Sequence, residues 1–293
     1  KTFKTTFAGR ELMVETGKVC GLANGSCWVH YGETVVMVNV TASAKPREGV
    51  DFFPLAVDYE EKLYAVGKIP GGYLKREGRP SEKAILNSRV VDRPMRPLFP
   101  KDMRNDVAIV MTVLAVDPET QPEIIAMIGA SIAVSISDIP WNGPIGGVFM
   151  GMTEEDGFIV NPTSEQRERS CLELTVAASE KKVVMIEAGA KEVSDEDMYD
   201  AIMLAHSEIK KLLVFINEII AAVGKPKFEY PSCEVDHDLY EKIEALVIDD
   251  VRVALDTDDK NIRDERMAPI YEKVYNEFDG GDPATHVMLD EIL

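Results

Sequence analysis

Residues 67–82 combine side chains that could hold a nucleic-acid strand. The stretch contains several glycines, an aromatic ring at Tyr73, and cations at Lys75, Arg76 and Arg79. Such cations bind phosphate groups, and an exposed ring can stack on an unpaired base. The stretch lacks the Gly-Lys-Ser/Thr sequence that ends a nucleotide-binding P-loop. Its composition therefore favours a glycine-rich loop that contacts a single strand.

A second group of cations follows on a predicted helix. Ser81 is a suitable N-cap, and residues 82–92 have the periodicity of an amphipathic helix. Three arginines are spaced at i, i+4 and i+7: Arg89, Arg93 and Arg96. They share one helix face if the helix continues through Pro94, and such a stripe can follow a phosphate backbone. The alternative is an internal ion-pair network with Asp92 and Glu82.

Other candidate groups carry weaker signals. The four histidines are scattered and lack the spacing of metal ligands. Asp256, Asp258 and Asp259 resemble part of a calcium loop, but the required glycine and distal glutamate are missing. The sequence contains no G-x-S-x-G nucleophile elbow and supports no serine or cysteine triad. These groups predict neither a metal site nor a nucleophile.

Charge is unevenly distributed along the chain. Its 293 residues carry 51 acidic and 32 basic side chains, for a net charge of −19 and a pI near 4.7. Residues 62–104 reverse this balance with eleven bases and four acids, whereas residues 226–293 carry 19 acids and seven bases. A local positive segment concentrates a polyanion near it. We therefore expect nucleic acid to contact the first segment rather than the second.

The composition is that of a globular protein with one large or two modest domains. Its hydrophobic content of 45% excludes a disordered chain, a collagen and a disulfide-stapled miniature scaffold. No run of about 18 apolar residues predicts a membrane span. The four cysteines form no CxxC pair, which favours reduced thiols. We expect a cytoplasmic protein that does not enter a membrane.

The apolar pattern predicts mixed strands and helices, followed by helices alone. Strands are expected in a meander over 11–42 and at 52–59, 106–116, 145–151, 157–160, 171–177 and 182–187. Helices are expected at 82–92, 123–135 and 195–223. A linker containing glycine and proline follows, and only helical periodicity remains after residue 236. The sequence thus predicts an α+β domain over 1–225 and an all-helical domain over 226–293.

Long, ordered motifs extend over almost the whole chain. They lie at 51–55, 59–65, 67–82, 92–99, 127–131, 138–145 and 161–163. Together they resemble the N-terminal part of the bacterial polynucleotide phosphorylase family, and the match weakens only after about residue 230. The resemblance implies a ribonuclease-PH-like domain (β-α-β-α, similar to ribosomal protein S5 domain 2) over 1–225, then a helical linker domain over 226–293. It also implies that this chain is part of a longer protein.

The resemblance further implies an activity and its partners. Enzymes of this family degrade RNA from the 3′ end with inorganic phosphate, use magnesium, and release nucleoside diphosphates. They form homotrimeric rings that thread single-stranded RNA through a central channel, and RNA-degradation complex proteins are expected as further partners. The family carries out its chemistry in a second ribonuclease-PH-like domain, which this chain does not contain.

For this reason, no catalytic residue is expected in this chain. The family's Gly-Ser-Ser phosphate turn corresponds to Thr120-Gln121-Pro122, where proline has no N–H to offer an anion. The family's Asp-x-Lys pair corresponds to Glu173 and Thr175, so a carboxylate remains but the cation is lost. The resemblance therefore implies that this domain has no phosphorolytic site of its own.

RNA contacts are instead assigned to the loop and the helix. The family's aromatic-aromatic-Arg-Arg sequence is replaced here by Tyr73-Leu74-Lys75-Arg76. We expect Tyr73 to stack on a base and Leu74 to narrow the channel. Lys75 and Arg76 are expected to bind phosphates. Four further arginines match basic family positions, and for them RNA contact and structural ion pairing both remain open: Arg79, Arg89, Arg93 and Arg96.

Two other interpretations remain open. A stand-alone, non-catalytic scaffold, like the inactive subunits of exosome rings, would assemble and bind RNA without turnover. A ribonuclease-PH-type enzyme that trims RNA ends would need intact phosphate and metal residues, which Pro122 and Thr175 argue against.

Overall fold

The computed structural model describes residues 1–47, 49–71, 77–232, 236–280, 289 and 292. It divides into two compact units, Lys1–Pro231 and Ser232–Leu293. Strands and helices are both present, which confirms the expected α+β class. No helix in these described ranges is long and apolar enough to cross a membrane.

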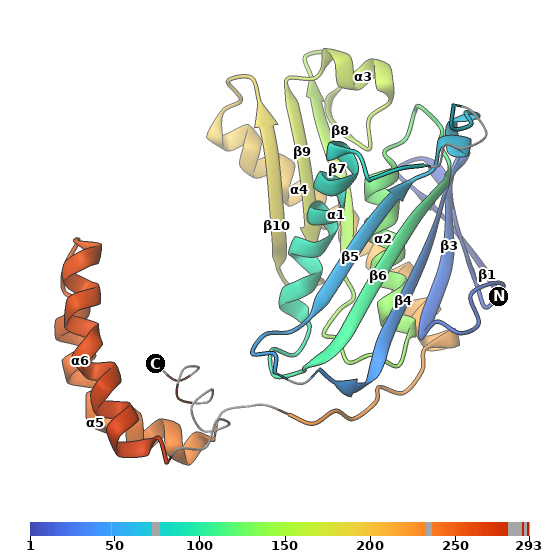
Figure 1. The fold of residues 1–293 in the computed structure, drawn as a ribbon. Helices are drawn as coiled ribbons and strands as arrows, with labels where there is room; N and C mark the ends of the chain where they lie inside the picture. Colours follow the sequence, from blue (N-terminus) through green and yellow to red (C-terminus); the bar gives the residue numbers. More distant parts are fainter. Residues whose placement is uncertain (48, 72–76, 233–235, 281–288, 290–291, 293) are drawn as a thin grey trace. The chain divides into compact units, whose positions relative to one another are not determined.

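Six strands form a mixed sheet in the first unit (Figure 1). They are β1 (Thr2–Phe7), β2 (Arg10–Thr16), β3 (Gly25–Tyr31), β4 (Thr34–Pro46), β5 (Leu55–Glu61) and β6 (Asn105–Ala115). Their order is β1-β2-β3-β4-β6-β5, and neighbours are antiparallel except for the parallel pair β5 and β6. Strand β3 alternates buried and half-buried side chains because one face of the sheet packs on the core.

A second sheet is antiparallel throughout, with the order β10-β9-β7-β8. Its strands are β7 (Gly146–Thr153), β8 (Gly157–Val160), β9 (Leu172–Ala178) and β10 (Val183–Ala190). In β9, Leu172, Leu174 and Val176 are fully buried, whereas Glu173 between them is exposed. Period-two alternation therefore places Glu173 on the face away from the core.

Helix α2 (Pro122–Ile136) connects the two sheets through a shared core. It packs against β3, β4 and β6 of the first sheet and against β7 of the second. Every residue from Ile124 to Ile136 is buried, which explains why this helix is apolar on all sides. A Cβ at Gly129 would lie 2.6 Å from Val38 Cγ2, so glycine permits the close approach of helix and sheet.

The other helices of the first unit cover its faces and edges. They are α1 (Glu82–Met95), α3 (Ser164–Arg169) and α4 (Asp195–Val223), with short 3₁₀ turns η1 (Leu63–Val66) and η2 (Arg96–Leu98). Ser81 caps α1 by accepting a hydrogen bond from Ala84 N at 3.0 Å. Helix α1 continues through Pro94, beyond the end at residue 92 that its prolines predict. Helix α3 was not predicted; it begins with a capping box between Thr163 and Gln166.

The segment after α4 belongs with the first unit, although the sequence predicts the domain boundary at 225/226. Lys227 Nζ donates hydrogen bonds to three carbonyls at the C-terminal end of α2, Val134, Ser135 and Ser137, at 3.2, 3.0 and 2.7 Å. Phe228 N donates to Asp138 O at 2.8 Å. These contacts extend the first compact unit to Pro231.

Two helices are described in the second unit, α5 (His237–Leu255) and α6 (Lys260–Phe278). They enclose a small core of Ile243, Val247, Ala254, Ile270, Val274 and Leu289. No strand lies in the part of this unit that the structure describes, in agreement with the helical periodicity after residue 236.

Candidate nucleic-acid interface

The predicted RNA loop is bounded by two ordered flanks. Tyr73, Leu74, Lys75 and Arg76 lie outside the described residues, so their assigned contacts stay predictions. The first flank is η1, which ends at Gly67 in the left-handed conformation (φ 70°). The second flank begins at Glu77 and leads into the Ser81 cap of α1.

Four exposed cations in and beside these flanks form no ion pair or side-chain hydrogen bond with another described residue. They are Lys68, Arg79, Lys83 and Arg89, which we call the free cations. Because no carboxylate engages them, their charge is available to a polyanion. The sequence motifs do not single out Lys83; its position two residues after the Ser81 N-cap is the signal that could reveal it.

Arg93 and Arg96 differ from the free cations because each has an acidic partner. Arg93 Nη1 lies 3.3 Å from Glu187 Oε2. Arg96 Nη2 lies 2.9 Å from Asp92 Oδ1 and also donates to Leu55 O at 3.0 Å. Arg93 and Arg96 thus form ion pairs, whereas Arg79 and Arg89 form none within the described residues; RNA contact by any of the four stays a prediction.

Two adjoining cavities form a cleft beside the N-terminal end of α2, which we call the α2 cleft. Their volumes are about 450 and 640 Å³. Both are lined by Lys83, Thr120, Pro122 and Arg167. The smaller cavity adds Glu173 from β9, and the larger one adds Arg79. The structure thus brings together the two positions that the resemblance matches to the phosphate turn and the Asp-x-Lys pair.

Several donors of the turn before α2 are already engaged within the turn. The buried Thr120 donates from its backbone N to Asp117 O at 3.0 Å, and from its hydroxyl to the same oxygen at 3.1 Å. Its hydroxyl is also hydrogen-bonded to that of Thr34. Pro122 has no N–H, and Ile124 N donates to Gln121 O at 3.2 Å. An anion at this turn would therefore find few of the donors that a phosphate site needs.

The smaller cavity of the α2 cleft also has an unfavourable charge for phosphate. Three carboxylates line it, from Glu123, Glu168 and Glu173, against the cations Lys83 and Arg167. The Arg167 guanidinium donates to Ser164 Oγ at 3.0 Å, Pro118 O at 3.3 Å and Pro162 O at 3.4 Å. It thereby connects α3 to the backbone at Pro118. Lys83 is then the cation of this cavity that has no partner among the described residues.

Tyr59 forms part of the wall of the larger cavity. Its side chain is 3% exposed, and burial raises the pKa of its hydroxyl strongly, with a further contribution from the nearby carboxylates of Glu123 and Glu61. The nearby Asn87 amide opposes this rise of the pKa only in part. The phenol is therefore neutral at physiological pH and supplies no charge to the cleft.

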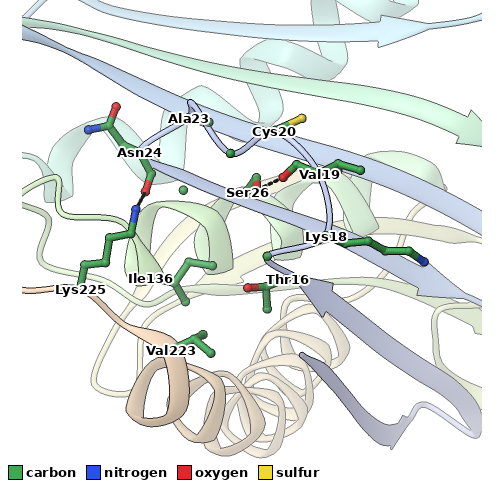
Figure 2. A pocket seen from close by; sticks show the side chains of 13 residues that line it. Thr16, Lys18, Val19, Cys20, Ala23, Asn24, Ser26, Ile136, Val223 and Lys225 are labelled. Atoms are coloured by element: carbon green, nitrogen blue, oxygen red, sulfur yellow. Dashed lines mark hydrogen bonds between the residues drawn. The ribbon is translucent and has the colours of Figure 1, made fainter.

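A third cavity, of about 280 Å³, lies beside the β2–β3 loop (Figure 2). Lys225 Nζ donates to Asn24 O at 2.6 Å across one side of it. Lys18 extends away from that pair, and its ammonium lies 5.5 Å from the ring centroid of Trp28. With both lysines engaged elsewhere, this cavity offers an anion no available cation among the described residues.

The described residues do not fit a resident metal ion. No group of three or more His, Cys, Asp or Glu side chains among them is arranged to hold one. Cys20, Cys27 and Cys171 are free thiols, and burial raises the pKa of Cys27 to about 12. That thiol is therefore protonated and unreactive.

The fold with its two sheets, central helix α2 and cleft defines a ribonuclease-PH-like protein. The crystal structure of rice Rrp46 shares this fold, with a TM-score of 0.57 at 13% identity, over 74% of this chain and 93% of that chain. Two models of the 3′ exoribonuclease family match the sequence, domain 1 over residues 8–140 and domain 2 over residues 143–208. The chain belongs to this 3′ exoribonuclease family.

Curated relatives agree with this assignment. Proteins named polyribonucleotide nucleotidyltransferase are 57% identical in Ruminiclostridium cellulolyticum over 93% of this chain, and 54% identical in Clostridioides difficile over 95%. The one from Caldicellulosiruptor bescii is 50% identical over the full 293 residues. The chain spans 39%, 40% and 42% of the lengths of these relatives.

Proposed function

We propose that this chain is the RNA-guiding N-terminal part of a polynucleotide phosphorylase, a phosphate-dependent 3′-to-5′ exoribonuclease. The identity to polyribonucleotide nucleotidyltransferases and the ribonuclease-PH-like fold support the family activity. In this reaction, an oxygen of inorganic phosphate attacks the phosphorus of the terminal phosphodiester, and the 3′ oxygen of the preceding nucleotide leaves. A nucleoside diphosphate and an RNA shorter by one nucleotide are the products.

The observation that carries this proposal is the contrast between the free cations and the turn at Thr120–Pro122. Exposed cations can hold RNA phosphates without a fixed geometry. Phosphorolysis requires preorganised donors around the attacking phosphate and the developing charge. Here the Thr120 donors are consumed, Pro122 has none, and Glu173 has no neighbouring cation at Thr175. This chain alone therefore binds RNA but does not cleave it.

RNA is guided by the loop and by the start of α1. Tyr73 stacks on a base, Leu74 narrows the path, and Lys75 and Arg76 bind phosphates. Arg79 and Arg89 add phosphate contacts, whereas Arg93 and Arg96 contribute mainly to the stability of the first unit through their ion pairs with Glu187 and Asp92. Single-strand stacking contributes about 1–3 kcal/mol per base. Because Arg76 is assigned to a phosphate, Arg76→Ala should weaken RNA binding and flatten its salt dependence.

The remaining parts of the reaction belong to a second ribonuclease-PH-like domain of the whole protein. That domain would bind the inorganic phosphate co-substrate and the magnesium ion. The whole protein would assemble as a homotrimeric ring in the cytoplasm, with RNA-degradation complex proteins as further partners. Residues 226–293 act as a helical linker, and their 19 acids against seven bases direct RNA toward the first unit.

Hydrogen exchange with and without oligo(A) tests where RNA binds. The proposal expects RNA to protect peptides within residues 67–89 and to leave residues 236–280 unchanged. Protection confined to the helical unit would overturn it. Anisotropy titration of the same oligonucleotide should give an affinity that falls as salt rises.

A further inference from the structure

Glu77 makes an unusual contact for an acid in a cationic segment. Its two carboxylate oxygens accept hydrogen bonds from the backbone N–H of Leu63, at 3.3 Å for Oε1 and 3.1 Å for Oε2. Leu63 begins η1, whereas Glu77 stands at the other end of the loop. This Glu77–Leu63 link therefore joins the two flanks of the segment that carries the predicted RNA contacts.

The first flank is fixed independently of Glu77. Val116 N, just beyond β6, donates to Ala65 O at 3.2 Å, and Lys68 N donates to Leu63 O at 3.0 Å. These bonds attach η1 to the end of the central sheet and complete its last turn. A group bonded to Leu63 N is consequently held against an ordered part of the unit.

The second flank is fixed on its far side by α1. The Ser81 hydroxyl accepts the bond from Ala84 N and donates to Glu61 Oε2 at 3.3 Å. Arg79 lies between this cap and Glu77, so both neighbours along the chain restrict its backbone. The Glu77–Leu63 link thus limits where Arg79 and Lys68 can lie relative to each other.

Considered by its charge alone, Glu77 should weaken RNA binding. Its carboxylate is a negative charge close to Lys68 and Arg79 in the sequence, and it contributes to the raised pKa of Lys62, whose principal cause is the hydrogen bond to Glu60. A charge of this sign repels RNA phosphates. Pure charge effects therefore predict that removing Glu77 tightens RNA binding.

We infer that Glu77 is a positioning residue for RNA binding, which holds the two described flanks together by accepting from Leu63 N and so places Lys68 and Arg79. The inference rests on the proposed function, because it assigns the loop to RNA. The carboxylate acts through the backbone and makes no contact with RNA itself. Its benefit to the placement of Lys68 and Arg79 exceeds the repulsion that it adds.

Three variants separate geometry from charge in an anisotropy titration with oligo(A). Glu77→Ala removes both the charge and the acceptor, whereas Glu77→Gln removes the charge and keeps an amide oxygen that can accept from Leu63 N. Glu82→Ala is the matched control, because it removes an exposed acid from the same stretch without breaking a described hydrogen bond. Thermal unfolding confirms that all three are folded.

The inference expects Glu77→Ala to bind oligo(A) about three- to tenfold more weakly, since one charged hydrogen bond is lost. Glu77→Gln and Glu82→Ala should bind as well as the unmodified chain or more tightly. Equal or tighter binding by Glu77→Ala would overturn the positioning role. So would equal weakening by Glu77→Ala and Glu77→Gln.

Hydrogen exchange of the Leu63 amide, measured without RNA, provides a second and independent readout. Exchange should accelerate in Glu77→Ala and stay slow in Glu77→Gln. If the unmodified chain failed to bind RNA, the proposed function would fail, but this exchange pattern would still support the role of Glu77 in joining the two flanks. Unchanged exchange in Glu77→Ala would contradict that role whatever the RNA result.

Discussion

Two of the free cations, Arg79 and Lys83, line the same α2 cleft as the turn at Thr120–Pro122, yet the cations and the turn differ in what they offer an anion. Arg79 and Lys83 line the larger cavity and have no described partner. At the turn, the backbone and hydroxyl donors of Thr120 are already bonded to Asp117 O, and Pro122 has no N–H. The two cations keep their charge available, whereas at the turn the donors of Thr120 are engaged internally and Pro122 has none.

This difference separates two tasks that one active site normally combines. Holding RNA needs mobile positive charge spread over several phosphates, and that task tolerates exchanges such as lysine for arginine. Activating phosphate needs donors fixed in one geometry, so losing a single N–H weakens the site severely. A domain can therefore lose phosphorolysis and still guide the substrate.

The largest expected effect comes from removing three free cations together. Arg79→Ala/Lys83→Ala/Arg89→Ala should weaken oligo(A) binding about a hundredfold at low salt and flatten the log–log salt slope by about 2, because about 0.7 counterions are released per single-strand phosphate contact. Anisotropy titrations at several salt concentrations measure both quantities. An unchanged slope would remove these cations from the RNA path.

A smaller effect, on stability alone, is expected at the other end of α2. Lys227→Met removes three hydrogen bonds from one ammonium to the helix carbonyls and should lower the free energy of unfolding by about 2 kcal/mol. Urea unfolding measures the loss, with the exposed Lys211→Met as control. Oligo(A) affinity should be unchanged. A large loss of binding would mean that the placement of the free cations depends on the contacts of Lys227 with the C-terminal end of α2.

Arg89 and Arg96 should show opposite effects. Arg96→Ala loses the ion pair with Asp92 and the bond to Leu55 O, so unfolding should become easier by about 1 kcal/mol with little change in RNA affinity. Arg89→Ala should leave unfolding unchanged and weaken RNA binding about three- to tenfold. Urea unfolding and anisotropy on both variants test this. Weaker RNA binding in Arg96→Ala than in Arg89→Ala would break the distinction between paired and free arginines.

The smallest effect concerns Glu15 in β2, outside both regions. The hydrogen bond from Lys18, followed by the charge of Lys18 and the contact with His30, lowers the pKa of Glu15 below its ordinary 4.5. The stabilisation is therefore present above pH 4.5 and is lost as pH falls through the lowered pKa. Glu15→Gln should cost under about 1 kcal/mol at neutral pH.

Unfolding of Glu15→Gln and of the unmodified chain, compared from pH 7 to pH 3, measures this contribution. The difference should shrink as the solution becomes acidic. A difference in the free energy of unfolding that grew toward low pH would contradict the stabilising role of the Glu15 carboxylate. A change in RNA affinity at neutral pH would show that the RNA-binding surface extends to β2.

The sequence predicts most of the first unit because its buried strands and helix α2 have clear periodicity. It misses β1, an edge strand with only one fully buried side chain, so that the apolar pattern is weak. It also misses α3, although the Thr163-x-x-Gln166 spacing is a capping-box signal that could have revealed this helix. The contacts of Lys227 with α2 depend on residues about 90 positions away, which local composition does not register.

The same limit applies to the site. Spacing places Arg89, Arg93 and Arg96 on one helix, but whether each is paired depends on partners such as Glu187, 94 residues from Arg93. Pro122 and Glu173, which the resemblance matches to the phosphate turn and the Asp-x-Lys pair, line one cavity in the structure. Local sequence does not reveal that Arg167 joins α3 to the carbonyl of Pro118, because these residues meet only in the folded chain.

The most direct test is the release of nucleoside diphosphate from poly(A) by this chain alone, with phosphate and magnesium, alongside a binding titration on the same RNA. The account predicts salt-sensitive binding without phosphate-dependent release. Release that requires phosphate and scales with the concentration of the chain would show a working phosphorolytic site here, and would contradict the assignment of Thr120–Pro122 as an inactive turn.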